Sequence, residues 1–249
     1  MKRFVVLALS LAVILLAVTG CRTISRVKEH ETLYFVGGFS NWLFEPLRRD
    51  ANNPYLFKMG RVMTWQGDGR FRFGTRTNSW ENQYSPTVAN ATFSHSLVLR
   101  DCADYNSWLL QEAESNRAYK MSLDTGSWPM VFTMFPFEAY PAVYLAGDAA
   151  GGMERNADFA MEMVDNNPFM FSWYGRLSPG QMSFFCEGYS GGDGPWFEPW
   201  KDGLEPNGLE QQVYLSAEPG GRGWYIDREG YYLVVIDQLQ EFALVIRDN

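Results

Sequence analysis

The feature that most constrains the fold of this 249-residue chain is an internal repeat. The segment LYFVG at residues 33–37 returns as VYLAG at residues 143–147, and NNPY at residues 52–55 returns as NNPF at residues 166–169. Later in each copy, AYKMSLD corresponds to YYLVVID, and the matching segments keep the same order. Two copies of about 110 residues predict two similar domains, each large enough to enclose its own core.

Each copy consists of short runs of strand-forming residues, such as Leu33-Tyr34-Phe35-Val36, separated by clusters of Gly, Pro, Asn and Asp. About seven or eight such runs per copy match the size and rhythm of an immunoglobulin-like sandwich. We therefore predict an all-β fold with two tandem immunoglobulin-like β-sandwich domains, at residues 32–137 and 138–249.

The first 20 residues have the anatomy of a signal peptide, with Lys2 and Arg3, an apolar run over residues 4–18 and small residues before Cys21. The segment VTGC, which ends at Cys21, resembles the lipobox of bacterial lipoproteins, whose cysteine is lipidated after cleavage. This resemblance implies a lipid anchor at Cys21, and the polar residues 21–31 are expected to form a tether. The alternative is an ordinary secretory signal followed by a cysteine that is not lipidated.

The charge of the chain restricts its partners. Its 21 basic and 29 acidic residues give a net charge of −8, and loss of the two basic residues of the leader would bring the charge to 19 − 29 = −10. Because no basic stripe offsets this charge, nucleic acid, anionic lipid surfaces and acidic polysaccharides are disfavoured as partners. The aromatic fraction of 16% is high for a globular chain, so some rings are expected to face solvent. Neutral ligands are therefore favoured.

The sequence contains little that predicts catalysis or a cofactor. Only two histidines occur, His30 and His95, and neither phosphate-cradling glycine motif is present. Acidic residues are plentiful, but acidic loops are usually solvated, and a glycosidase needs two carboxyls across one bond. We predict no enzyme activity, no catalytic residue, no metal site and no cofactor. A disulfide between Cys102 and Cys186 stays open, although two separate thiols are favoured because the cysteines fall in different copies.

The motifs VGGFSNW, PLRR, FRF and NSW of the first copy resemble the glycogen-binding domain of the AMP-activated protein kinase β subunit and of starch-debranching enzymes. The second copy, with VYLAGDAAGGM and GYYLVVID, is similar to repeats of SusE and SusF, which are outer-membrane starch-binding lipoproteins with tandem sandwiches. The resemblance implies non-catalytic binding of a neutral, starch-like α-glucan by a lipoprotein of a glycan-uptake system. It also implies a place at the outer membrane, on the cell surface, beside a glycan transporter complex. The residues RTISR directly after Cys21 lack the early acidic residues that surface-exported lipoproteins are expected to carry, so the sequence leaves the membrane face of the anchor open.

The resemblance to glycogen-binding domains implies that Trp42, Trp80 and Arg72 hold the glycan, with arginine in place of the usual lysine. An indole offers a flat apolar face to a sugar ring, and a guanidinium can donate paired hydrogen bonds to neighbouring hydroxyls. Strand alternation predicts that Phe71 and Phe73 face the core while Arg72 faces outward. The alternative is that Trp42 closes the edge of the sandwich and the arginine is merely solvated.

The second copy departs from this pattern. Met153 falls where the first tryptophan would be, Ser183 replaces the arginine, and Trp196 is expected to keep the place of Trp80. The segment GYSGGDGPWFEPWKDG around Trp196 is expected to be an exposed loop, because glycine and proline disfavour a core strand. This copy is expected either to act as a spacer or to bind through a set of its own: Trp196, Trp200, Lys201 and Arg222.

A second hypothesis, from a different functional class, is a structural lipoprotein that docks a protein partner through exposed aromatic residues. Trp108 and Trp224 occur at equivalent places in the two copies, and the sequence leaves open whether they belong to the cores or to binding surfaces.

Overall fold

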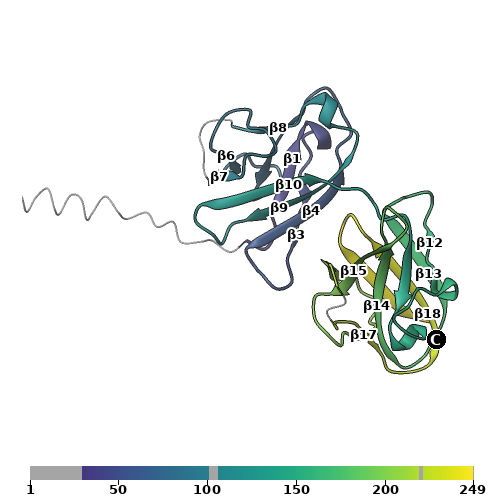
Figure 1. Cartoon of the computed structure of the whole chain (residues 1–249). Coiled ribbons are helices and arrows are strands. Elements are labelled where there is room, and N and C mark those ends of the chain that lie inside the picture. The colour runs from purple at the N-terminus through teal and green to yellow at the C-terminus, as the bar shows by residue number, and fades with distance from the viewer. Residues whose placement is uncertain (1–29, 101–105, 219–220, 249) are drawn as a thin grey trace, which may run out of the picture.

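The computed structural model describes residues 30–100, 106–218 and 221–248. Within these ranges the chain is built from β-strands and short 3-10 turns, and the strands form two separate antiparallel sheets that follow each other along the chain (Figure 1). The predicted all-β class with two tandem β-sandwiches is confirmed. The signal peptide, most of the tether, the lipidation site at Cys21 and Cys102 lie outside the described residues.

The first sheet has the strand order β2-β1-β5-β6-β7-β10-β9-β4-β3, and β8 pairs with β5. Its strands are β1 (Tyr34–Gly37), β2 (Glu45–Pro46), β3 (Arg48–Arg49), β4 (Leu56–Val62), β5 (Arg70–Gly74), β6 (Tyr84–Pro86), β7 (Leu97–Arg100), β8 (Trp108–Leu109), β9 (Ala118–Asp124) and β10 (Met130–Pro136). The 3-10 turns η1 (Gly38–Ser40) and η2 (Glu112–Glu114) interrupt this order.

The first sheet folds over on itself around an aromatic core. The ring of Phe71 on β5 lies 5.9 Å from that of Phe132 on β10, and Trp108 stacks on Phe71 at 5.8 Å. All three side chains are almost fully buried. Burial of so many large rings from both halves of the sheet supplies the main driving force for folding of this sandwich.

The second sheet has the strand order β11-β14-β15-β16-β19-β18-β13-β12, and β17 pairs with β14. Its strands are β11 (Val143–Ala146), β12 (Glu162–Met163), β13 (Met170–Leu177), β14 (Gly180–Glu187), β15 (Asp193–Pro199), β16 (Gln211–Ser216), β17 (Trp224–Ile226), β18 (Gly230–Asp237) and β19 (Phe242–Arg247). The 3-10 turns η3 (Asp148–Ala150) and η4 (Ala157–Phe159) follow β11.

Trp108 and Trp224 occupy equivalent places in the two cores, and neither has any exposed surface. The indole nitrogen of Trp108 donates to the carbonyl of His95 (2.9 Å), and that of Trp224 donates to the side chain of Gln211. Each ring is therefore buried with its polar atom satisfied. These two tryptophans belong to the cores, which decides the question that the sequence left open.

The two sheets are joined between the end of β10 at Pro136 and the start of β11 at Val143. The predicted domain boundary between residues 137 and 138 falls within this connecting segment, and it stays a prediction. In the described ranges, no helix is long and apolar enough to cross a membrane.

Candidate functional site

The predicted site on the first sandwich is built on the pair of strands β1 and β5. Phe35 lies opposite Phe73 in this pair, and both side chains are fully buried in the core. The next pair is Val36 and Arg72, so strand alternation turns Arg72 toward the outer face of the sheet. Regular pairing with β1 thus fixes the place of Arg72 on the outer face.

A tight loop after β1 carries Trp42 back toward this face. Asn41 and Trp42 both have left-handed backbones, with φ of 51° and 60°, a conformation that costs energy for residues other than glycine. The loop is held by Trp42 N, which donates to the Gly37 carbonyl (2.8 Å), and by Ser40 Oγ, which donates to the Leu43 carbonyl (2.7 Å). These bonds fix the strained turn and hence the direction of the indole.

Trp80 completes the predicted group. Its ring lies 5.9 Å from that of Trp42 at an angle of 61°, and the guanidinium carbon of Arg72 lies 5.1 Å from the centre of the Trp80 ring. Half of the Trp80 side chain is exposed, and Gln83 Nε2 donates to its carbonyl (2.7 Å), which steadies the loop. The structure therefore brings the three residues predicted from the sequence into one cluster.

The structure adds Phe44, which sequence reasoning did not single out. The Phe44 ring lies 5.4 Å from that of Trp80, and it occupies the space above Gly74, where an added Cβ would approach Phe44 Cε1 to 2.9 Å. Phe44 follows Trp42 by two residues in NWLF, but nothing in the family resemblance pointed to it. We call this cluster of Trp42, Phe44, Arg72 and Trp80 the first face.

Arg70, the neighbour of Arg72 on the same face of β5, has a different role. Its Nε and Nη2 atoms donate to the two carboxylate oxygens of Asp68, both at 3.0 Å. These hydrogen bonds hold the pKa of the Asp68 carboxyl below its ordinary value. The Arg70 guanidinium is thus committed to a local ion pair, which separates it from the aromatic cluster.

The register of the second sandwich corrects the prediction for Trp196. Phe73 pairs with Tyr84 in the first sandwich, and Phe184 pairs with Phe197 at the equivalent place in the second. Trp196 therefore stands in the position of Gln83, not of Trp80. It is also only 7% exposed, so the expected exposed platform is wrong.

The segment around Trp196 is a strand, not a loop. The glycine turn is confined to residues 188–192, where Gly188 N donates to the Gly192 carbonyl (2.8 Å), and β15 begins directly afterwards. Pro195 falls where the pairing of β14 and β15 shifts between Phe185 and Glu187. A proline is tolerated at such an irregularity, because its missing N–H removes no regular ladder bond there.

Around Trp196 the second sandwich has an aromatic cluster of its own. The Phe185 ring lies 5.1 Å from that of Trp196, and the Arg155 guanidinium lies 5.4 Å from the centre of Tyr144 and 5.9 Å from that of Phe185. Arg155 also pairs with Glu187 at 3.5 Å. Arg155, Phe185 and Trp196 line an open cavity of about 540 Å³ together with Met153. We call the cluster of Tyr144, Arg155, Phe185 and Trp196 the second face.

Ser183 pairs with Ala146 as Arg72 pairs with Val36, so the predicted loss of the arginine is confirmed. The other predicted residues of this half do not gather with Trp196. Arg222 Nε lies 3.2 Å from the buried Glu198 carboxylate, beside a cavity of about 60 Å³. Trp200 lines a groove of about 710 Å³ next to the first sandwich, and Lys201 is exposed.

The clusters also show which chemistry the surface offers. Among the described residues, no three His, Cys, Asp or Glu side chains lie close enough together to hold a metal ion. The first face presents apolar ring faces and one guanidinium. This combination can hold a sugar by ring stacking and by hydrogen bonds to its hydroxyls.

No protein-family model matches this chain, and a comparison with curated proteins gives no significant match. A comparison with solved structures finds a likeness to the structure titled "Crystal Structure of SusF from Bacteroides thetaiotaomicron", at 16% sequence identity and a TM-score of 0.37. The match covers 89% of this chain and 49% of that one, so this chain spans about half the length of the SusF structure. SusF is one of the two proteins that the second copy of the sequence resembles.

Proposed function

We propose that the protein binds a neutral polysaccharide, without cleaving it, on the first face. The observation that carries this proposal is the packing of Trp42, Phe44, Arg72 and Trp80 into one partly exposed group on a well-paired sheet. Two indoles at 61° suit a curved chain better than a flat one, which favours a starch-like α-glucan. The aromatic rings and the guanidinium cannot act as the two carboxyls that glycoside hydrolysis requires.

The charge of the protein agrees with a neutral ligand. The formal net charge is −8, and the basic side chains of the described residues are frequently paired with carboxylates, as Arg70 is with Asp68. An anionic polysaccharide would meet net repulsion over most of the surface. A neutral glycan carries no such penalty and can use the rings directly.

The cellular setting that we propose rests on the sequence resemblance. A lipid at Cys21 would anchor the protein to the outer membrane through the tether, on the cell surface, where it would hold glycan near a transporter complex. The membrane is thus a partner through the anchor, and no nucleic acid is expected. Protease accessibility on intact cells tests the surface location: cleavage of the protein in intact cells supports it, and complete protection contradicts it.

The second face supports binding less strongly than the first. Trp196 is nearly buried, and Trp196, Trp200 and Arg222 line three different cavities, so they offer no common platform. Of the two expectations for this half, the spacer role therefore receives more support from the geometry. The cavity beside Arg155 is the place where binding by this half would occur.

Tryptophan fluorescence of the chain without its predicted leader tests the proposal against a panel of neutral glycans that includes maltooligosaccharides. We expect a shift of the emission with one of these glycans, because Trp42 and Trp80 are partly exposed and would be covered by the ligand. The shift should weaken in Trp80→Ala, disappear in the double variant Trp42→Ala with Trp80→Ala, and persist in Trp128→Ala, which removes another exposed indole. Co-purification of a protein partner with no response to any glycan would favour the docking hypothesis instead.

A further inference from the structure

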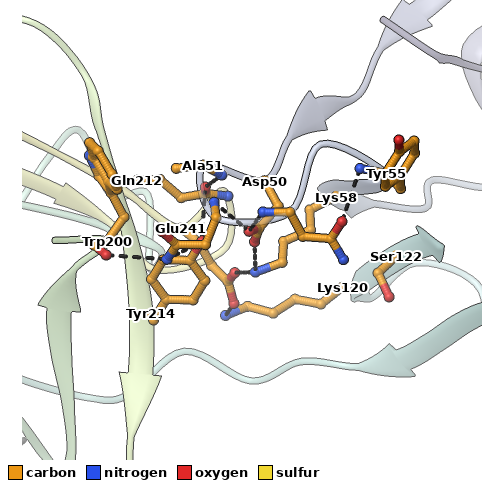
Figure 2. A network of polar contacts seen from close by, with 12 residues as sticks. Asp50, Ala51, Tyr55, Lys58, Lys120, Ser122, Trp200, Gln212, Tyr214 and Glu241 are labelled. Atoms are coloured by element: carbon orange, nitrogen blue, oxygen red, sulfur yellow. Dashed lines mark hydrogen bonds and ion pairs between the residues drawn. The ribbon is translucent and has the colours of Figure 1, made fainter. Parts of the chain in front are cut away.

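The two sandwiches meet along a polar junction, which the repeat pattern did not predict. Figure 2 shows Lys58 and Lys120 of the first sandwich reaching toward Glu241 of the second, with Asp50 and Tyr214 beside them. Lys58 comes from β4 and Lys120 from β9, whereas Glu241 lies in the turn between β18 and β19.

Glu241 is the carboxylate that these two lysines share. Its Oε1 lies 2.8 Å from Lys120 Nζ and its Oε2 lies 3.7 Å from Lys58 Nζ, while Lys58 also pairs with Asp50 at 2.9 Å. Lys120 is only 7% exposed, and burial lowers the pKa of its ammonium group. Removing a partner from a buried ion pair leaves an uncompensated charge away from water. The buried Lys120 therefore depends on a carboxylate supplied by the other sandwich, whereas Lys58 has Asp50 of its own sandwich as its nearer partner.

The backbones of the two sandwiches are also in direct contact. A Cβ added to Gly60 on β4 would lie 2.0 Å from the Leu239 carbonyl oxygen, and all three of its nearest atoms belong to Leu239. Gln240 Nε2 donates to the Gly60 carbonyl (2.5 Å). The turn between β18 and β19 thus packs against β4 at a place where only glycine fits.

The connecting segment is bound to the second sandwich as well. The side chain of Gln238 is fully buried, and it accepts from Tyr140 N (2.8 Å) and donates to the Tyr140 carbonyl (3.2 Å). The segment between the sheets is therefore held by the second sandwich.

A further hydrogen bond joins the two sandwiches directly, because Ala51 N of the first donates to Gln212 Oε1 of the second (2.7 Å).

From these contacts we infer that the two sandwiches behave as one rigid body, with Glu241 as the residue on which their attachment depends. Relative motion is the default for tandem domains joined by a short linker, unless the interface between them is extensive. Here the interface combines the carboxylate shared by two lysines, the close backbone contact at Gly60, and the hydrogen bonds that hold the linker at Tyr140 against the second sandwich. This inference does not depend on the proposed glycan binding.

Urea unfolding and limited digestion by chymotrypsin test the inference on the chain without its predicted leader. The wild-type protein is expected to unfold in one transition and to resist cleavage after Phe137. Glu241→Gln is expected to separate the unfolding into two transitions and to raise the rate of that cleavage roughly tenfold or more, because opening exposes the linker. Gly60→Ala should have the same effect by wedging the interface apart without altering a charge.

Two further variants isolate the role of Glu241. Glu210→Gln makes the same charge change at an exposed ion pair with Arg48 across the junction, and it should behave like the wild type. The double variant Lys120→Met with Glu241→Gln leaves Lys58 paired with Asp50, so it should recover the single transition.

The inference is overturned if the wild-type protein unfolds in two transitions with rapid cleavage after Phe137. The role assigned to Glu241 is overturned if Glu241→Gln matches Glu210→Gln, or if the double variant stays open.

Discussion

The first face and the second face both combine an arginine with aromatic rings, but strand and loop exchange the parts that they supply. In the first sandwich the strand β5 supplies Arg72 and the loop supplies the ring of Phe44. In the second sandwich the strand β14 supplies the ring of Phe185, at the place of Gly74, and the loop supplies the guanidinium of Arg155. Both faces thus place a guanidinium beside aromatic rings. The arginine comes from the strand in the first face and from the loop in the second.

This exchange shows what the packing requires at this surface. A ring from the loop needs space above the sheet, and Gly74, which has no side chain, leaves that space for Phe44. In the second sandwich Phe185 fills this space, and the loop places the long, flexible side chain of Arg155 over it instead. The two solutions differ in exposure: Trp80 is 50% exposed and Trp196 is 7% exposed. The first face therefore presents an exposed indole to solvent, as the proposed glycan binding requires, whereas the second face buries its indole by packing.

The largest expected effect contrasts the two tryptophans in stability. Trp196→Ala should lower the free energy of unfolding by about 3–5 kcal/mol, because it removes a nearly buried indole and leaves a cavity. Trp80→Ala should cost less, about 1–2 kcal/mol, since half of the residue is already exposed to solvent and the loss is mainly that of its contacts with Trp42 and Phe44. Urea unfolding of both variants checks this, and equal costs would show that the two rings do not differ in role.

The next effect concerns affinity. Arg72→Ser gives the first face the residue that the second face has at this position, and it should weaken glycan binding by about 1.5–3 kcal/mol through lost hydrogen bonds to a charged group. Arg70→Ser is the matched control, because Arg70 is bound to Asp68 rather than to the aromatic cluster. Titration with the glycan selected from the panel measures both variants, and equal losses would argue against a specific role for Arg72.

A smaller loss of affinity is expected from Gly74→Ala. The new Cβ would displace Phe44 from its place beside Trp80, and the loss of such an aromatic pair is worth about 0.5–1.5 kcal/mol. The same titration shows the effect. Unchanged affinity would mean that Phe44 does not support the binding surface.

The smallest effect is expected for Arg155→Ala on the second face. The pair of Arg155 with Glu187 is partly exposed and long, so the free energy of unfolding should fall by only about 0–1 kcal/mol. Thermal or urea unfolding measures it. A loss clearly above this range would mean that the second face depends on its arginine for folding, and the comparison with the first face would need revision.

Much of the first face was predictable because its residues follow local rules. Alternation along β5 placed Arg72 outward and Phe71 and Phe73 in the core, and the structure has them so. Trp42 and Trp80 were identified by resemblance, and the structure brings them together. Phe44 was missed because its role depends on the space above Gly74, which only the pairing of β1 with β5 reveals.

The second face was harder to predict, because matching residues by type ignores strand register. Trp196 was aligned with Trp80, but the tight turn between β14 and β15 leaves no long loop to carry a tryptophan. Arg155 reaches the cluster from a loop, and no periodic pattern places a loop side chain over a sheet. The junction around Glu241 could not be predicted either, since it joins Glu241 to Lys58 and Lys120, which are at least 121 residues away in the sequence.

Calorimetric titration with a maltooligosaccharide tests directly whether the first face binds glycan. It compares the wild-type chain with the double variant Trp42→Ala with Trp80→Ala and with Trp128→Ala. Truncation of both indoles should abolish measurable binding, since each aromatic contact is expected to contribute about 1–3 kcal/mol. The wild type and Trp128→Ala should bind alike. Binding that survives in the double variant, or no heat from the wild type with this or any other neutral glycan of the panel, would show that the first face is not a glycan-binding site.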